Sequence, residues 1–114
     1  MKNTIIIFTF LLSGFIYSQD NKPKLEVFGQ TVKATYYHAN GKVQQEGNFL
    51  KGKLEGTWTS FDENGNKIAV GNYENGTKTG KWFFWNGANL NEVDYSKNQI
   101  ANVKTWTETA IAKN

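Results

Sequence analysis

From Gly47 to Trp82 the chain reads GNFLKGKLEGTWTSFDENGNKIAVGNYENGTKTGKW, and this stretch repeats itself. Its glycines and aromatic residues return 24 positions later, as from Trp58 to Trp82. The matched pairs are Gly47 and Gly71, Phe49 and Tyr73, Gly52 and Gly76, Gly56 and Gly80, and Trp58 and Trp82. A period of this size is typical of stacked supersecondary units. The sequence therefore predicts an array of repeats.

Turn dipeptides separate the apolar and aromatic runs of this array. Asn-Gly occurs at 40–41, 64–65, 75–76 and 86–87, and Lys-Gly at 51–52. Asn-Gly favours tight hairpin turns because both residues tolerate positive φ. We therefore predict an all-β fold, an antiparallel meander of β-hairpin repeats with about seven strands in one elongated single sheet. The expected strands are 32–38, 43–50, 54–61, 67–74, 78–85, 90–95 and 100–107, with an added edge strand at 25–28. A capping box at Thr105 and Glu108 makes a short final helix the alternative to a strand there.

Glycines inside the expected strands need a structural role, because a strand glycine lowers stability and often marks a close approach. Gly56 and Trp58 are two residues apart and share a face, as do Gly80 and Trp82. We expect each Trp ring to lie over glycines of a neighbouring strand, and Trp58, Trp82 and Trp106 to form a continuous buried stripe. The structural repeat positions are Gly47, Gly52, Gly56, Trp58, Gly71, Gly76, Gly80, Trp82 and Trp106.

The N-terminus has the pattern of a secretory signal peptide. Lys2 is positively charged, 5–16 is almost wholly apolar, and the small residue Ser18 precedes Gln19. The apolar run is shorter than the roughly 20 residues that a membrane-spanning helix needs. We therefore predict a mature chain that is exported to the periplasm or secreted and does not span the membrane. The predicted divisions are a signal peptide at 1–18, a linker at 19–24, a β-repeat domain at 25–107 and a C-terminal tail at 108–114.

The composition excludes several kinds of site. The 114 residues contain no cysteine, so neither a disulfide nor a site built on thiols is available. All 13 basic residues are lysine, and the formal net charge is +3. Without arginine there is no planar fork for a phosphate or a guanine base. The lysines are scattered singly, many of them at turns, which is typical of a solvated surface. We therefore predict no nucleic-acid partner.

The stretch 52–65 resembles the MORN repeat, and most closely the variant of bacterial antitoxin-like MORN proteins. Its pattern is Gly-Lys, Gly and Trp at fixed spacing, then an aromatic residue and Gly, and the stretch 76–85 is a second copy. The resemblance implies β-hairpins stacked into a single-layer sheet, and roles in scaffolding or in contacts with proteins or lipid. The chain departs from the MORN pattern at two places. Ala34 stands where the later units have Trp. The Asn-Gly turn of the third unit, at 86–87, follows the one at 64–65 after 22 residues instead of 24.

Residues that could carry catalysis are few and isolated. His38 is the only histidine and precedes an Asn-Gly turn, so we expect a solvated turn residue. The carboxylates of Asp62 and Glu63 fall in a turn. Glu92 and Asp94 share one face of a strand, where we expect solvent rather than a cleft. We predict no catalytic residue, no metal site and no cofactor.

A small enzyme is an alternative, because proteins of this kind are sometimes labelled nicotinate-mononucleotide adenylyltransferases. Such an enzyme would need a βαβ nucleotide fold and a His-x-Gly-His pair to hold phosphates. The chain has one histidine and no arginine, and a β-meander offers no helix N-terminus for the phosphates. We therefore predict a protein that is not an enzyme.

The run 82–85 consists of four aromatic residues. Alternation along a strand directs two of them to each face, and on a single-layer sheet one pair would form an apolar surface. The predicted binding residues are Trp82, Phe83, Phe84, Trp85 and Tyr95. They indicate an interaction module for an unknown protein, glycan or envelope lipid. The alternatives are a sheet that curls to cover both faces, and a structural envelope protein that self-associates edge to edge.

Overall fold

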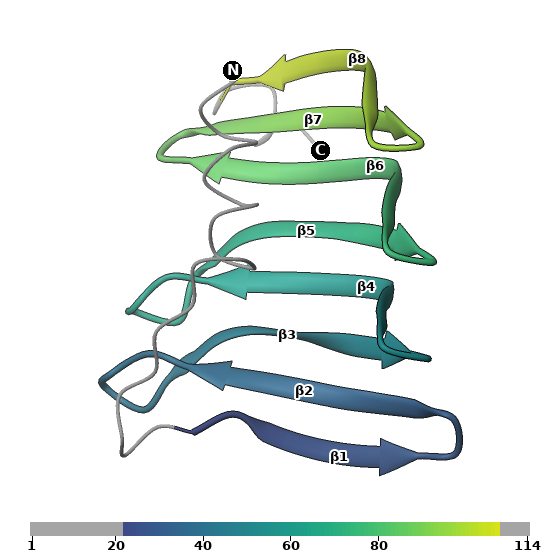
Figure 1. Ribbon diagram of the computed structural model, residues 1–114. Helices are drawn as coiled ribbons and strands as arrows, with labels where there is room; N and C mark the ends of the chain where they lie inside the picture. Colours follow the sequence, from purple (N-terminus) through teal and green to yellow (C-terminus); the bar gives the residue numbers. More distant parts are fainter. Residues whose placement is uncertain (1–21, 108–114) are drawn as a thin grey trace.

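A computed structural model describes residues 22–107 of the chain. They form one open sheet of eight antiparallel strands, paired in chain order as a meander of hairpins (Figure 1). The strands are β1 (Lys24–Phe28), β2 (Thr31–Tyr37), β3 (Val43–Leu50), β4 (Lys53–Phe61), β5 (Lys67–Glu74), β6 (Thr77–Asn86), β7 (Asn89–Ser96) and β8 (Gln99–Trp106). In this part of the chain no helix is long and apolar enough to cross a membrane.

The predicted all-β meander in a single sheet is confirmed, with eight strands instead of about seven. The additional edge strand is β1, and it begins at Lys24, which the sequence had placed in the linker. The chain continues as strand through Trp106, where a short helix was the alternative. The predicted signal peptide at 1–18 and the tail at 108–114 lie outside the described residues.

Two-residue turns join the hairpins at one end of the sheet, among them 51–52, 75–76 and 97–98. Both residues of each have positive φ, as in Asn75 at 56° and Gly76 at 83°, which the tight turns of twisted hairpins require. Successive turns are bonded to the preceding repeat. The Asn75 N–H donates to a Glu55 carboxylate oxygen, and the Gly76 N–H donates to the Leu54 carbonyl oxygen, both at 2.8 Å.

The sheet bends at two places where a single glycine faces three residues of the next strand. Gly47 of β3 faces the segment 56–58 of β4, because the pairing register shifts there by two residues. The same shift recurs between β5 and β6, 24 residues later. Gly56 and Gly80 take φ values of 76° and 72° at the bends, in the left-handed region that glycine tolerates. Figure 1 shows the ribbons of β4 and β6 turning sharply near the end of the sheet that carries the two-residue turns. We call this line of bends the crease.

Two indole rings lie in the crease and cover its glycines. The Trp58 ring lies over Gly47 and the Trp82 ring over Gly71, so closely that a Cβ atom at either glycine would overlap the ring. Each ring N–H donates to the carbonyl oxygen of the residue after its glycine, at 3.0 and 3.1 Å. Trp58 is 1% and Trp82 0% exposed. These rings occupy the centre of the core.

The core lies on one face of the sheet, along the crease. Tyr73 packs edge-on against Trp82 with 5.0 Å between ring centroids, and Trp82 packs edge-on against Tyr95 at 5.7 Å. Each large aromatic side chain removes an area of about 150–250 Å² from water, which stabilises a fold that has no cysteine. The buried hydrophobic residues are Ala34, Trp58, Ala69, Tyr73, Trp82, Phe84, Val93 and Tyr95.

The expectation that each Trp ring lies over a glycine of a neighbouring strand is confirmed at Gly47 and Gly71, but it is wrong for Gly80, and Gly56 is not covered either. No other side chain lies within 4 Å of the place where a Cβ atom would stand at either position. Their positive φ explains the requirement for glycine instead. The 24-residue repeat therefore contains two kinds of glycine: one lies under an indole ring, and the other lies where the strand bends.

Trp106 does not continue the tryptophan stripe, because the register of β8 differs from that of β4 and β6. At the crease β6 has two more residues than its partner β5, whereas β8 has only one more than β7. A difference of one residue reverses the face of every side chain beyond it. Trp106 consequently pairs with Leu90, on the face opposite the core.

Candidate functional site

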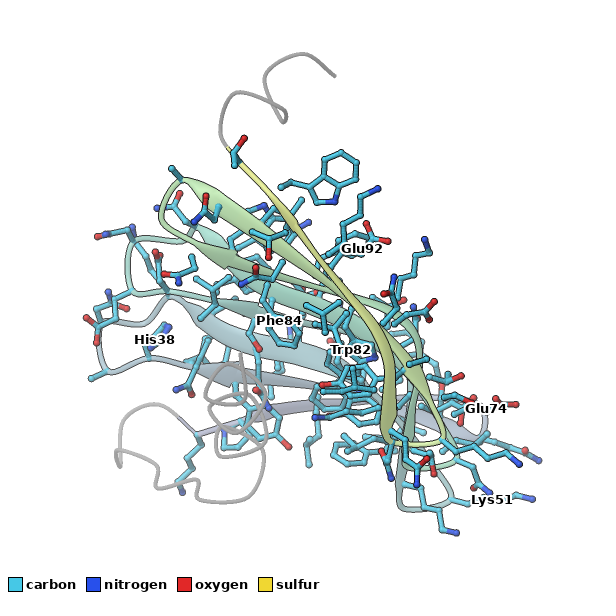
Figure 2. All side chains as sticks on the ribbon, turned by 90° about the horizontal axis from the view of Figure 1, so that it is seen from above. His38, Lys51, Glu74, Trp82, Phe84 and Glu92 are labelled. Atoms are coloured by element: carbon cyan, nitrogen blue, oxygen red, sulfur yellow. The ribbon has the colours of Figure 1, made fainter. Side chains whose placement is uncertain are left out.

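The aromatic run 82–85 is divided between the two faces of the sheet. Trp82 and Phe84 belong to the core and are 0% and 3% exposed, as is Tyr95 at 3%. Phe83 and Trp85 project from the other face and are half-buried. Figure 2 shows Trp82 and Glu92, the cross-strand neighbour of Phe83, on opposite sides of the sheet. Of the five predicted binding residues, only Phe83 and Trp85 are placed to meet a partner.

Four large apolar side chains gather on the face opposite the core, over β6, β7 and β8. Trp85 pairs with Leu90, and Leu90 pairs with Trp106, so the three form one row across the strands. Phe83 adjoins Trp85, with 6.5 Å between ring centroids and 36° between planes. All four side chains are half-buried. We call Phe83, Trp85, Leu90 and Trp106 the aromatic patch.

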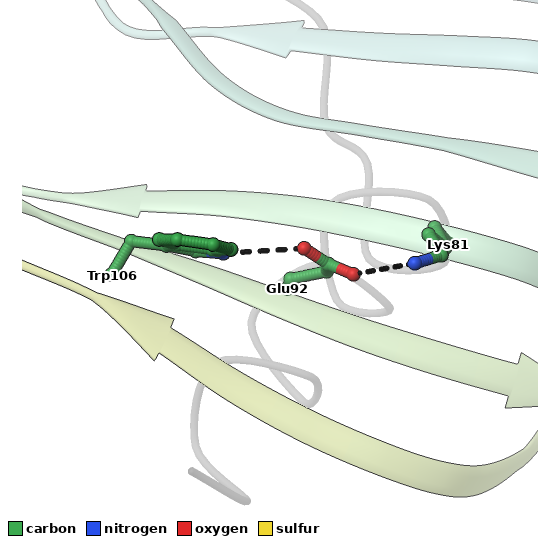
Figure 3. A network of polar contacts seen from close by, with 3 residues as sticks. All are labelled: Lys81, Glu92 and Trp106. Atoms are coloured by element: carbon green, nitrogen blue, oxygen red, sulfur yellow. Dashed lines mark hydrogen bonds and ion pairs between the residues drawn. The ribbon is translucent and has the colours of Figure 1, made fainter. Parts of the chain in front are cut away.

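A charged network holds one side of the aromatic patch in place (Figure 3). The Lys81 ammonium donates to Glu92 Oε2 at 2.9 Å, and the Trp106 indole N–H donates to Glu92 Oε1 at 3.2 Å. Lys104 Nζ lies 4.1 Å from the centroid of a Trp106 ring, a cation–π contact. The indole is therefore held by a hydrogen bond at its edge and by a cation on its face.

The same contacts shift the pKa values of two side chains, Glu92 and Lys81. The hydrogen bonds from Lys81 and then from Trp106 lower the pKa of Glu92 below its usual value. The Glu92 carboxylate in turn raises the pKa of Lys81. The Glu92 side chain is only 16% exposed, against 61% for Lys81. Glu92 is therefore part of a network, not the solvated carboxylate that the sequence led us to expect.

His38 is also not the solvated turn residue that we expected. It is half-buried, and its Nε2 lies 2.9 Å from the Phe61 carbonyl oxygen, to which it donates. Nearby, the Asn40 side-chain amide donates to the Glu63 carbonyl oxygen at 2.8 Å. These contacts join the connection at 38–42 to the one at 62–66. Both residues thereby connect neighbouring repeats.

The turn carboxylate Asp62 serves the backbone of its own turn. One of its oxygens accepts the N–H groups of Asn64 and Asn66, both at 2.9 Å. The backbone hydrogen bond from Asn66, followed by the one from Asn64, lowers the Asp62 pKa. Within residues 22–107 no group of three or more His, Cys, Asp or Glu residues is placed to hold a metal ion.

Sequence comparison agrees with the repeat that the structure shows. Residues 30–51 and 54–75 match the family described as MORN repeat variant. The two matches begin 24 residues apart and coincide with the hairpins β2–β3 and β4–β5. They support a protein built of MORN repeats. No curated protein matches the chain.

Proposed function

We propose that this chain is an exported, non-enzymatic interaction module of the bacterial antitoxin-like MORN variant, and that the aromatic patch is its binding surface. The observation that carries the proposal is the row Trp85, Leu90 and Trp106, three large apolar side chains on the face away from the core. An apolar patch with a charged border is typical of an interaction site. The partner is a protein, a glycan or an envelope lipid.

The aromatic patch suits recognition because its members lose little freedom when a partner binds. Lys104 and Glu92 already hold the Trp106 ring, and ordering a side chain beforehand lowers the entropic cost of binding. Aromatic residues with a polar group, such as tryptophan, are frequent among the residues that dominate binding energies. Lys81 and Lys104 would meet acidic groups at the border of the aromatic patch.

The test is capture by the mature chain from an envelope extract, with a photo-crosslinking residue in place of Leu90. The expected result is one crosslinked protein, glycan or lipid that Trp85→Ala reduces at least tenfold, which corresponds to the loss of an anchor of about 1.4 kcal/mol. The matched control is Val27→Ala on the edge strand β1, where Val27 is 72% exposed. Equal capture by the wild type and Trp85→Ala would overturn the proposal.

Export has its own test. The apolar run at 5–16 followed by Ser18 predicts cleavage before Gln19. Intact-mass measurement of the protein recovered from the envelope or the medium should therefore give a chain that starts at Gln19. A recovered protein that retains Met1 would contradict export through a cleaved signal.

We infer that the protein carries out no nucleotidyl transfer. The sequence has no arginine and one histidine, and the ring of that residue, His38, is bonded to the Phe61 carbonyl oxygen. Incubation of the mature chain with ATP and nicotinate mononucleotide should release no pyrophosphate above a blank without protein. Sustained release that scales with protein concentration would refute this inference.

Edge-to-edge self-association is a second candidate, favoured by the exposed apolar side chains of the edge strands. The exposed large hydrophobic residues are Leu25 (64%), Val27 (72%) and Phe28 (59%) on β1 and Ile100 (47%) on β8. Because β1 and β8 run antiparallel, β8 of one copy next to β1 of another would continue the meander. Sedimentation velocity should then show mass that increases with concentration and that Val27→Lys abolishes. A concentration-independent monomer would exclude this candidate.

A further inference from the structure

Two tight turns at the same end of the sheet rest on the hairpin before them in the same way. The Gly76 N–H donates to the Leu54 carbonyl oxygen at 2.8 Å. One repeat later the Asn98 N–H donates to the Lys78 carbonyl oxygen at 3.0 Å. Leu54 and Lys78 occupy the same place in the 24-residue period. The second turn is therefore equivalent to the first, and the surroundings of the two turns can be compared residue by residue.

At the first turn a carboxylate accepts the N–H of the leading turn residue. The Asn75 N–H donates to Glu55 Oε1 at 2.8 Å. Asn75 and Gly76 both have positive φ. A hydrogen bond from a backbone N–H to a carboxylate is charge-assisted and stronger than one between neutral groups. The array thus contains one example of a carboxylate held by a turn of this kind.

At the second turn the equivalent carboxylate is missing. Thr79 stands at the place of Glu55, because Thr79 pairs across the strands with Asn72 as Glu55 pairs with Asn48. Lys97 leads this turn, and it and its neighbour have positive φ values of 50° and 69°, as at the first turn. Among residues 22–107 no group accepts the Lys97 N–H. The donor that Glu55 satisfies at the first turn is therefore open at the second.

A hollow of about 500 Å³ lies at the second turn, and this volume is within the range of sites for small molecules. The turn does not need the hollow to be filled, because Asn98 Oδ1 also accepts the Lys78 N–H at 2.8 Å. The residues that line the hollow are Glu74, Asn75, Thr77, Thr79, Lys97 and Asn98. The hollow therefore brings the open N–H together with an ammonium group, a carboxylate and two hydroxyls.

The two charged side chains of the hollow have opposite signs. Lys97 and Glu74 are both exposed, and the ion pairs within residues 22–107 do not join them to each other. The ammonium of Lys97 would attract a carboxylate towards the open N–H, and Glu74 would attract an ammonium group while repelling a bare anion. A ligand that carries both charges suits the hollow better than a simple anion does.

We propose that the hollow binds a small zwitterion, an amino-acid-like compound, whose carboxylate takes the place that Glu55 occupies at the first turn. The Lys97 N–H donates to a carboxylate oxygen and the Lys97 ammonium supplies the opposite charge. The ammonium group of the ligand lies against Glu74. The hollow is at the start of β6, whereas Trp85 of the aromatic patch is near the end of that strand. The inference therefore does not rest on the proposed binding surface.

The test is a titration of the isotope-labelled mature chain, followed through its amide resonances by NMR at constant ionic strength. The ligands are sodium acetate and the free amino acids glycine, β-alanine and γ-aminobutyrate, which differ in the spacing of their two charges. The Lys97 amide should shift saturably, whereas the Asn75 amide, already bonded to Glu55, should not. The best amino acid should bind up to about fivefold more tightly than acetate, as one exposed ion pair allows. No saturable shift at Lys97, or an equal shift at Asn75, would overturn the proposal.

The matched variant is Thr79→Glu, which rebuilds the first turn at the second. It should fold, as judged by circular dichroism, because Glu55 occupies the equivalent position. The Lys97 amide should then resonate at its ligand-bound position without any ligand, and acetate should no longer move it. A folded Thr79→Glu whose Lys97 amide responds to acetate like the wild type would refute the site.

Two further variants test the comparison of the turns and the role of the second charge. Glu55→Thr should open the Asn75 N–H, so that acetate now shifts the Asn75 amide; a folded variant without this shift would contradict the assignment of the carboxylate position. Glu74→Gln should remove the preference for the best amino acid over acetate. A preference that survives this substitution would overturn the assignment of a zwitterion.

Discussion

Gly71→Ala should destabilise the protein although it adds only a methyl group. The Cβ atom would overlap Cδ2, Cε2 and Cε3 of the Trp82 ring. The backbone of Gly71 has no positive φ, so alanine meets no torsional strain there. Alanine also lowers the conformational entropy of the unfolded chain, which by itself would favour folding by about 0.4–1 kcal/mol. Any loss of stability must therefore come from the contact with the ring.

The magnitude depends on which of two rearrangements is easier. Moving the strands apart to admit the methyl group costs about 1–3 kcal/mol, as overpacking usually does. Swinging the Trp82 ring out exposes about 150–250 Å², which is worth about 4–6 kcal/mol at about 25 cal/mol per Å². The indole hydrogen bond to the Asn72 carbonyl oxygen, at 3.1 Å, would be lost as well. The strands should therefore move, with a loss of about 2–3 kcal/mol.

The assay is thermal and urea unfolding followed by circular dichroism. A loss of about 2–3 kcal/mol corresponds to a fall in Tm of roughly 10–20 °C for a domain of this size. Gly47→Ala, under Trp58 in the preceding repeat, should give a similar loss. Gly80→Ala is the matched control, because its Cβ atom meets no neighbour but its φ is +72°, which costs about 1–2 kcal/mol. A smaller effect for Gly71→Ala than for Gly80→Ala would refute the packing argument.

Three further predictions concern the two faces of the sheet and the pH dependence that Glu92 and Tyr95 give to its stability. Phe84→Ser should lower stability by about 3–5 kcal/mol, whereas Trp85→Ser should mainly reduce partner capture; equal unfolding of both would place both rings in the core. Since Lys81 lowers the pKa of Glu92, the stabilisation from this carboxylate is present above its unfolded pKa of 4.5 and lost as pH falls through the folded value. Acid unfolding of the wild type and Glu92→Gln should thus converge at low pH, and parallel curves would contradict this. Burial raises the pKa of Tyr95 from 10.0 to about 12, so its stabilisation is complete below pH 10.0 and lost as pH rises towards 12. Ultraviolet titration should show a tyrosine ionising near 12, and Tyr95→Phe should keep its stability across that range.

The sequence predicted where the candidate site lies along the chain, but not which residues form it. The aromatic run 82–85 indicates two side chains on each face by alternation alone. Alternation does not say which pair faces the core, since both Trp82 with Phe84 and Phe83 with Trp85 satisfy it. Leu90 and the Lys81–Glu92 ion pair were not predicted as parts of the site, because they adjoin it only through cross-strand pairing.

Trp106 shows why the pairing register between strands could not be predicted from the sequence. Its spacing of 24 from Trp82 placed it in the core stripe. The pairing of β8 with β7 gains one residue at the crease instead of two, and the indole passes to the other face. The 22-residue spacing of the third turn signals an irregular third repeat. This spacing does not show whether the pairing register between β7 and β8 shifts by one residue or by two at the crease.

Local chemistry determined the number, order and turns of the strands, because hairpin turns depend on residues adjacent in the chain. Asn75 and Gly76 specify their turn through their own tolerance of positive φ, and the 24-residue period follows from such turns recurring. The tertiary structure alone decided which glycines lie under rings and which lie at bends. Gly71 and Gly80 look alike in the sequence, yet the first is covered by Trp82 and the second meets no neighbour. That difference arises from the register between strands, which no single stretch of the chain contains.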